Sequence, residues 1–217
     1  MWAVTAAGVS GVLLAGGQGW RMGGGDKCLR LLAGRTILDR IVERVRPQVA
    51  RLLLNANGDP ERFASTGLPV SADTLPGHLG PLAGVLTGME WAAAQAPDSP
   101  WLLTVPTDAP FLPADLVARL LAAVEADGAD MACAVSGGRT HPVVGLWPIR
   151  LASALRRAML DEDMRKVGLW TGRYRLAAVA WETEPLDPFF NANRPDDLAI
   201  AERILSRCGA SHNGHGV

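Results

Sequence analysis

The chain has 217 residues, of which 48% are hydrophobic, and its formal net charge is −1. This length suits one large domain with a sizeable core, and the near-neutral charge gives no bulk attraction to nucleic acid or to an acidic membrane. No stretch reaches the roughly 18 apolar residues that a membrane-spanning helix needs, and three widely spaced cysteines indicate reduced thiols in a cytoplasmic protein.

Apolar runs of strand length alternate along the chain with segments of helical periodicity. In chain order, the pattern predicts a strand over 9–15, a helix over 36–45, a strand over 51–54, a short helix over 61–65, a strand over 68–71, a helix over 81–95, a strand over 101–105, a helix over 113–126, strands over 129–135 and 142–147, a helix over 149–160, a strand over 174–181 and a last helix over 195–207. This alternation predicts a three-layer, doubly wound α/β fold with a mostly parallel sheet. We expect one domain over 1–210 and a disordered tail over 211–217.

Polar groups follow several of the predicted strands. Asn55, Asp73 and Asp108 each come just after a strand, and so does a glycine-rich segment that begins at Leu14. In sheets of this kind, ligands bind beyond the carboxyl ends of the strands. The sequence therefore predicts a binding site at one edge of the sheet, built from four separate segments.

The glycine-rich segment from Leu14 to Lys27 reads LAGGQGWRMGGGDK. Its backbone can approach a ligand closely, its amide groups can form a nest for an anion, and Arg21 and Lys27 add positive charge suited to a polyphosphate. It fails the P-loop pattern because Cys28 stands where Ser or Thr is required. It fails the dinucleotide pattern because Met22 stands at the third glycine position. The remaining interpretations are another kind of phosphate-binding loop and a plain glycine-rich surface loop.

The pattern LAGGxxxRMGGxDK of this segment resembles the nucleotidyltransferases of molybdenum cofactor synthesis, in particular the MobA-type guanylyltransferase family. Five further segments resemble elements of that family in the same order: Asn55-Ala-Asn57, Gly80-Pro-Leu-Ala-Gly84, Pro106-Thr-Asp-Ala-Pro110, His141-Pro-Val143 and Phe190-Asn-Ala-Asn193. The resemblance implies a Rossmann-like nucleotidyltransferase fold. It also implies an enzyme that transfers GMP from GTP to molybdopterin-bound molybdenum cofactor, forming the guanine dinucleotide cofactor and releasing pyrophosphate. Thr107 stands where the family usually has Cys, and Arg194 stands where Thr is common, which bears on contacts to the pterin.

Carried over residue by residue, the resemblance implies a nucleotide site. Its nucleotide-binding residues would be Leu14, Ala15, Gly16, Gly17, Lys27, Asn55, Asp73 and Asp108. The implied catalytic residues are Arg21, Lys27 and Asp108. The two cations would neutralise the β- and γ-phosphates. Asp108 would bind Mg²⁺, with Mn²⁺ as an alternative, because such ions prefer hard oxygen ligands.

Five residues are candidates for the pterin side: His141, Arg165, Lys166, Asn191 and Asn193. Most of them have an ordinary structural alternative. His141 could cap a strand entrance, Asn193 is a good N-cap for the helix that follows, and the two basic residues could lie on a solvated face.

Two other functions remain open from the sequence. The cytidylyltransferase of the same pathway resembles LAAGxSxRMG in this loop, whereas this chain has Leu14-Ala-Gly-Gly17, which favours guanine. A non-catalytic nucleotide or cofactor adaptor would not need the metal carboxylate Asp108. GTP and molybdenum cofactor are the expected small-molecule partners, with molybdoenzyme chaperones and the molybdenum-insertion enzyme as possible protein partners. We expect a monomer or weak oligomer that binds neither nucleic acid nor membrane.

Overall fold

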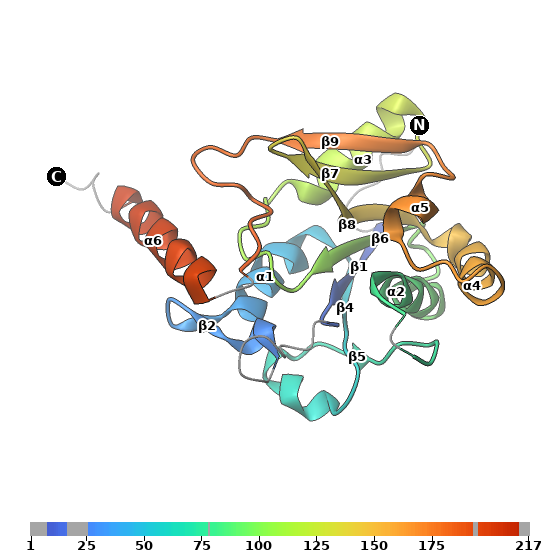
Figure 1. The fold of residues 1–217 in the computed structure, drawn as a ribbon, viewed down its shortest axis with the longest axis horizontal. Helices are drawn as coiled ribbons and strands as arrows, with labels where there is room; N and C mark the ends of the chain where they lie inside the picture. Colours follow the sequence, from blue (N-terminus) through green and yellow to red (C-terminus); the bar gives the residue numbers. More distant parts are fainter. Residues whose placement is uncertain (1–7, 17–25, 78, 193–194, 213–217) are drawn as a thin grey trace.

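A seven-stranded sheet with helices on both faces forms the body of the protein (Figure 1). The computed structural model describes residues 8–16, 26–77, 79–192 and 195–212. The strands of the large sheet are β1 (Val9–Leu14), β4 (Arg51–Asn55), β5 (Val70–Ser71), β6 (Trp101–Pro106), β7 (Met131–Ser136), β8 (Arg139–Pro148) and β9 (Leu176–Trp181). The α-helices are α1 (Ile37–Val45), α2 (Pro81–Gln95), α3 (Leu116–Asp127), α4 (Ala152–Asp161), α5 (Val167–Thr171) and α6 (Pro195–His212).

The sheet order is β5-β4-β1-β6-β8-β7-β9, and every strand except β8 runs in the same direction. Leu14 at the end of β1 pairs with Asn55 on one side and with Pro106 on the other. The carboxyl ends of these three strands are therefore level with one another. The predicted three-layer, mostly parallel fold is confirmed.

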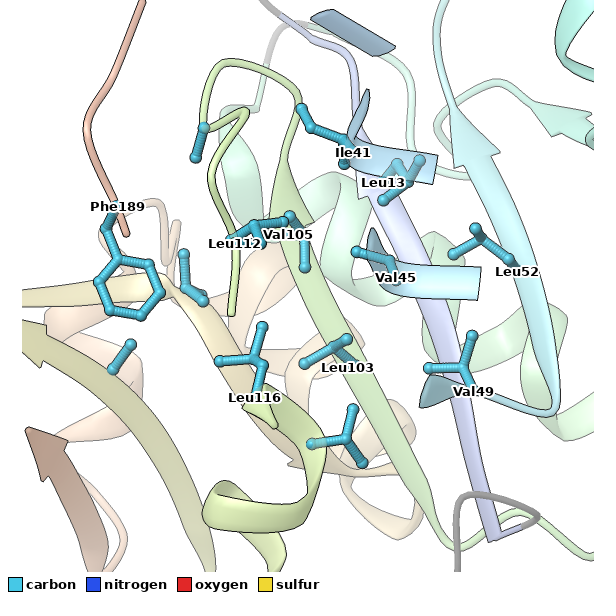
Figure 2. Packing of buried hydrophobic residues seen from close by; sticks show 14 of the residues in the cluster. Leu13, Ile41, Val45, Val49, Leu52, Leu103, Val105, Leu112, Leu116 and Phe189 are labelled. Atoms are coloured by element: carbon cyan, nitrogen blue, oxygen red, sulfur yellow. The ribbon is translucent and has the colours of Figure 1, made fainter. Parts of the chain in front are cut away.

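Two hydrophobic clusters fill the space on either side of the sheet, because successive strand residues point to opposite faces. Leu13 of β1 lies in the cluster with α1 and α3, whereas its neighbour Val12 lies in the cluster with α2, α4 and α5. Figure 2 shows part of the first cluster, where Leu103 and Val105 of β6 share the core with Ile41 of α1. The buried faces of the helices thus fix each helix against the sheet.

Helix α2 lies unusually close to β1 because glycines face the strand. A Cβ atom at Gly88 would lie 2.7 Å from Cγ1 of Val12, and one at Gly84 would lie 2.4 Å from Oδ1 of Asn55. Real Cβ atoms do not approach other atoms so closely. The two glycines therefore let the first turns of α2 reach the carboxyl ends of β1 and β4.

Several short elements were not predicted. The hairpin of β2 (Leu31–Leu32) and β3 (Arg35–Thr36) turns at Ala33 and Gly34, both with positive φ, and its strands are too short for a visible alternation. The short helix expected over 61–65 is a 3₁₀ helix, η5 (Pro60–Thr66), and further 3₁₀ turns are η3 (Lys27–Leu29), η4 (Arg46–Gln48) and η6 (Ile149–Leu151). Helix α5 was also missed.

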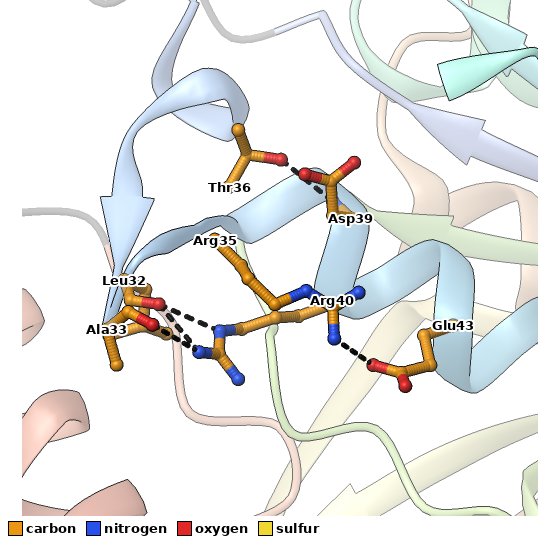
Figure 3. Close-up of polar contacts among 7 residues, drawn as sticks. All are labelled: Leu32, Ala33, Arg35, Thr36, Asp39, Arg40 and Glu43. Carbon is orange, nitrogen blue, oxygen red and sulfur yellow. Dashed lines mark hydrogen bonds and ion pairs between the residues drawn. The ribbon is translucent and has the colours of Figure 1, made fainter. Parts of the chain in front are cut away.

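The hairpin is held against α1 by polar contacts (Figure 3). Arg40 Nε and Nη2 donate to the carbonyl of Leu32 over 3.0 and 2.7 Å, and Thr36 Oγ1 caps α1 by accepting from the amide of Asp39. An exposed ion pair joins Arg35 to Glu43 at 2.8 Å.

The last helix, α6, continues to His212, beyond the end that the sequence predicted. Its Glu202 accepts a 3.3 Å hydrogen bond from the amide of Ala33 in the hairpin. The single-domain assignment stays a prediction. Among the described residues, no helix is both long enough and apolar enough to cross a bilayer.

Candidate functional site

A cavity of about 410 Å³ opens at the edge of the sheet where β1, β4 and β6 end. The predicted site residues that line it are Leu14, Ala15, Gly16, Lys27, Asn55, Asp73 and Asp108. Its wall also contains residues that stand in the sequence motifs but were not predicted as site residues, among them Asp26, Asn57 and Val143. Gly17, Arg21 and Asn193 lie outside the described residues. The structure thus gathers into one cavity groups that are far apart in the sequence.

The ends of the central strands are joined by hydrogen bonds beside the cavity. The amide and hydroxyl of Thr107 both donate to the carbonyl of Leu14, at 3.3 and 3.2 Å, and the amide of Ala15 donates to the carbonyl of Asn55 at 2.9 Å. Asp108 follows Thr107 directly, so its position is tied to the end of β1.

Cys28 lines the same cavity but is not an activated nucleophile. Burial, followed by the nearby charge of Asp26, raises the pKa of the Cys28 thiol to about 11. A nucleophilic cysteine needs a lowered pKa. The thiol therefore stays protonated near neutral pH and serves as part of the cavity wall.

Asp73 is oriented by two asparagines from the end of β4. Nδ2 of Asn55 donates to its Oδ1 over 3.0 Å and Nδ2 of Asn57 donates to its Oδ2 over 2.8 Å, while the amide of Asp73 donates back to Oδ1 of Asn57 over 2.9 Å. Asn55 also donates to the carbonyl of Ser71, so both N–H groups of its side-chain amide are used. Asn55 is only 4% exposed. The structure thus places Asn55 in direct support of Asp73. Asn57 belongs to the Asn55-Ala-Asn57 motif, but its contact with Asp73 had no local signal in the sequence, because Asp73 follows a different strand, β5 (Val70–Ser71).

The segment before α6 returns to the metal-site candidate Asp108. The amide of Ala192 donates to the backbone carbonyl of Asp108 over 2.9 Å, and the neighbouring Asn191 is exposed. His141 stands behind this segment and does not line the cavity: its ring lies 5.0 Å from that of Phe189, and its Nε2 is 2.8 Å from Ser136 Oγ. Burial lowers the pKa of His141, which favours the neutral imidazole.

Arg165 and Lys166 lie between α4 and α5. The Arg165 guanidinium donates to the carbonyls of Met159 and Met164, at 2.8 and 2.9 Å, and pairs with Asp163. Arg165 is thereby engaged at the end of α4, whereas Lys166 is exposed. The carbonyl of Arg165 is 3.9 Å from where a Cβ of the cavity residue Gly80 would sit, so the pair borders the α2 side of the cavity.

The acidic side chains of the cavity suit a hard cation. Asp26, Asp73 and Asp108 line it, but among the described residues no group of three or more His, Cys, Asp or Glu side chains could hold a metal ion by itself. Mg²⁺ commonly takes one or two carboxylates and completes its shell with phosphate oxygens and water. The donor set therefore fits an ion that binds together with a nucleotide, and does not fit a structural zinc site.

Comparison with known proteins places this fold in a family. A model of the MobA-like NTP transferase domain matches residues 11–174. A protein of Rhodopseudomonas palustris (strain BisB5) called molybdenum cofactor guanylyltransferase is 58% identical over 196 residues, covering 90% of this chain and 93% of that protein.

Solved structures are similar in fold. Molybdopterin-guanine dinucleotide biosynthesis protein A of Archaeoglobus fulgidus has a TM-score of 0.70 at 24% identity, over 91% of this chain and 99% of that one. The Rv0371c protein of Mycobacterium tuberculosis H37Rv, solved in complex with manganese, has a TM-score of 0.66 at 15% identity, over 91% and 99% of the two chains. The sequence pattern, the sheet and the match over most of its length agree: this chain belongs to the MobA-like NTP transferase family.

Proposed function

We propose that the protein transfers GMP from GTP to molybdopterin-bound molybdenum cofactor, forming the guanine dinucleotide cofactor and releasing pyrophosphate. One observation carries this proposal: Lys27, Asp73 and Asp108, which come from three distant segments, line a single cavity at the carboxyl ends of the strands. The name of the 58% identical relative supports the same choice of substrates.

The proposed reaction needs mainly positioning and charge stabilisation. The nucleophile is a phosphate that is already anionic, so little general base is required. The difficulty is to bring two anions together and to stabilise charge as pyrophosphate leaves. Lys27, together with Arg21, would neutralise the β- and γ-phosphates.

The carboxylates of the cavity would have different tasks. Each oxygen of Asp73 already accepts one amide N–H and keeps a lone pair, so the carboxylate could also accept from guanine N1 and N2 or from ribose. Asp108 would hold Mg²⁺, or Mn²⁺ in its place. Such an ion, when bound, supplies positive charge to the phosphate oxygens.

The second substrate would enter beside Asp108. Asn191 would face it from the segment that hydrogen-bonds to the Asp108 backbone, with His141 supporting that segment from behind. Asn193 would serve the same substrate. Arg165 and Lys166 would approach from the α2 side. We also propose a cytoplasmic monomer or weak oligomer that passes its product to molybdoenzyme chaperones and receives its substrate from the molybdenum-insertion enzyme.

The test is to incubate the purified protein with Mg²⁺, GTP and molybdopterin-bound molybdenum and to measure the guanine dinucleotide and pyrophosphate. Parallel reactions contain CTP or ATP, and Mn²⁺ or a chelator in place of Mg²⁺. We expect product with GTP and none with the chelator. Tighter binding and faster turnover of CTP would reassign the base, whereas GTP binding without any pyrophosphate release would indicate an adaptor.

A further inference from the structure

Arg62 lies on η5, outside the residues that line the cavity, yet its side chain reaches two segments of the cavity wall. Its Nε is 2.6 Å from Oδ2 of Asp26, and its Nη2 donates to the carbonyl of Asn57 over 2.5 Å. The side chains of Arg62 and Asp26 are 30% and 21% exposed, so water screens this ion pair only in part.

The local backbone makes room for this guanidinium. Gly58 has a φ of +89°, and a Cβ atom there would lie 2.8 Å from Nη1 of Arg62. A side chain at this position would meet both a strained backbone and the arginine. The glycine therefore lets Arg62 lie against the turn that follows β4.

The two segments that Arg62 joins carry different parts of the proposed nucleotide site. Asp26 is the N-cap of η3, which begins with Lys27, the proposed phosphate ligand. Asn57 exchanges two hydrogen bonds with Asp73, the proposed ligand of the base or sugar. One side chain thus connects the segment of the proposed phosphate ligand with the segment that orients the proposed ligand of the base or sugar.

The ion pair between Arg62 and Asp26 also affects the charge of the cavity. Its carboxylate lines a cavity proposed to take a polyphosphate, where an uncompensated negative charge would repel the ligand. Arg62 offsets that charge from behind the wall. Guanidinium is suited to this task because it stays charged and can contact two acceptors at once.

We propose that Arg62 is a positioning residue of the nucleotide site: it fixes the Asp26–Lys27 segment relative to the Asn57–Asp73 pair and neutralises Asp26. This inference rests on the proposed function of the cavity. Arg62 does not touch the substrate itself and acts through residues that do.

The test is the affinity for Mg²⁺-GTP, measured by titration calorimetry well below the melting temperature. Arg62→Gln loses the charge and one of the two contacts, and we expect GTP binding about tenfold weaker. Arg62→Lys keeps the charge beside Asp26 but not the forked geometry, and should give an intermediate affinity. Arg62→Gln combined with Asp26→Asn should bind GTP no more weakly than Arg62→Gln alone, because the two residues act as a unit.

The matched control is Arg35→Gln, which removes the exposed 2.8 Å ion pair with Glu43 on α1. We expect its GTP affinity to stay within about twofold of the parent. A lower melting temperature of Arg62→Gln with unchanged GTP affinity would overturn the inference, because it would show a purely structural role.

Lys27→Ala, measured alongside, separates this inference from the function it rests on. If Lys27→Ala weakens GTP binding and Arg62→Gln does not, the positioning role fails alone. If both variants bind GTP like the parent, the nucleotide site is misassigned and the inference fails with it.

Discussion

The backbone amide of Ala192 donates a 2.9 Å hydrogen bond to the backbone carbonyl of Asp108. This bond joins the segment before α6 to the turn that follows β6. Because it uses the carbonyl of Asp108 and not its carboxylate, the turn can keep its position when the side chain is changed. A substitution at Asp108 therefore changes the carboxylate while this backbone hydrogen bond is kept.

For Asp108→Asn, we expect pyrophosphate release from GTP and molybdenum cofactor to fall on the order of a hundredfold or more, because an amide is a poor ligand for a divalent ion at this position. The melting temperature should stay close to that of the parent. Asp115→Asn, which changes an exposed carboxylate near the start of α3, is the control and should keep full activity. Unchanged pyrophosphate release by Asp108→Asn would remove the metal assignment.

Lys27→Ala should weaken GTP binding about tenfold to a hundredfold, since it removes a charge-assisted contact to the phosphates. The effect should shrink at high salt, where charges are screened. Arg51→Ala, an exposed cation at the opposite end of β4, is the control for loss of positive charge. Equal GTP affinities of Lys27→Ala and the parent at low salt would contradict the phosphate role.

Gly84→Ala should destabilise the protein by about 1–3 kcal/mol, because the added methyl group meets Asn55 Oδ1 and Leu14 in a packed region. Moving Asn55 would also disturb its bond to Asp73. The matched control is Gly168→Ala in α5, where a Cβ has no neighbour within 4 Å and should be neutral or slightly stabilising. Urea unfolding of both variants measures the difference, and equal stabilities would show that α2 can shift away from β1.

The sequence predicted the long elements well because each carries a repeated physical signal. Strand β1 is a largely apolar run, and α2 begins with a proline in its first turn. Both positions follow from local chemistry. The placement of Asn55, Asp73 and Asp108 at one edge followed from the rule for parallel sheets.

Contacts between distant segments could not be predicted in the same way. Nothing in the sequence near Arg62 indicates that it reaches Asp26, and the motif Asn55-Ala-Asn57 does not indicate that Asn57 contacts Asp73. The sequence suggested that Asn55 reads the nucleotide, whereas its two amide N–H groups are used to hold Ser71 and Asp73. Such roles depend on which strands become neighbours.

Burial raises the pKa of the Cys133 thiol, which lies in β7, to about 11 from 9.0. Well below pH 9 the thiol is neutral in both the folded and the unfolded protein, so its ionisation does not change the free energy of unfolding. Between these two values the unfolded chain loses the proton first, so the folded state loses up to about 1.4 kcal/mol of stability per pH unit. The free energy of unfolding should therefore fall more steeply with rising pH in the parent than in Cys133→Ala.

Urea unfolding from about pH 8 to about pH 11 gives the two curves. Cys133→Ala should also lower stability by a constant amount, because it leaves a small cavity. Only the difference between the slopes of the two stability curves against pH reports the ionisation of the Cys133 thiol. Parallel curves would mean that Cys133 ionises equally easily in the folded and unfolded protein.

The strand pairs of the sheet close loops of very different length, and we expect them to assemble at different speeds. Strand β8 follows β7 after the two-glycine turn Gly137–Gly138, so this pair closes a short loop. The strands that end at the cavity pair in parallel across long crossovers, which form more slowly. We expect the cavity to be among the last regions to form and the first to open. A ligand that binds only the closed form would shift the equilibrium toward that form, so bound nucleotide would protect the protein against unfolding.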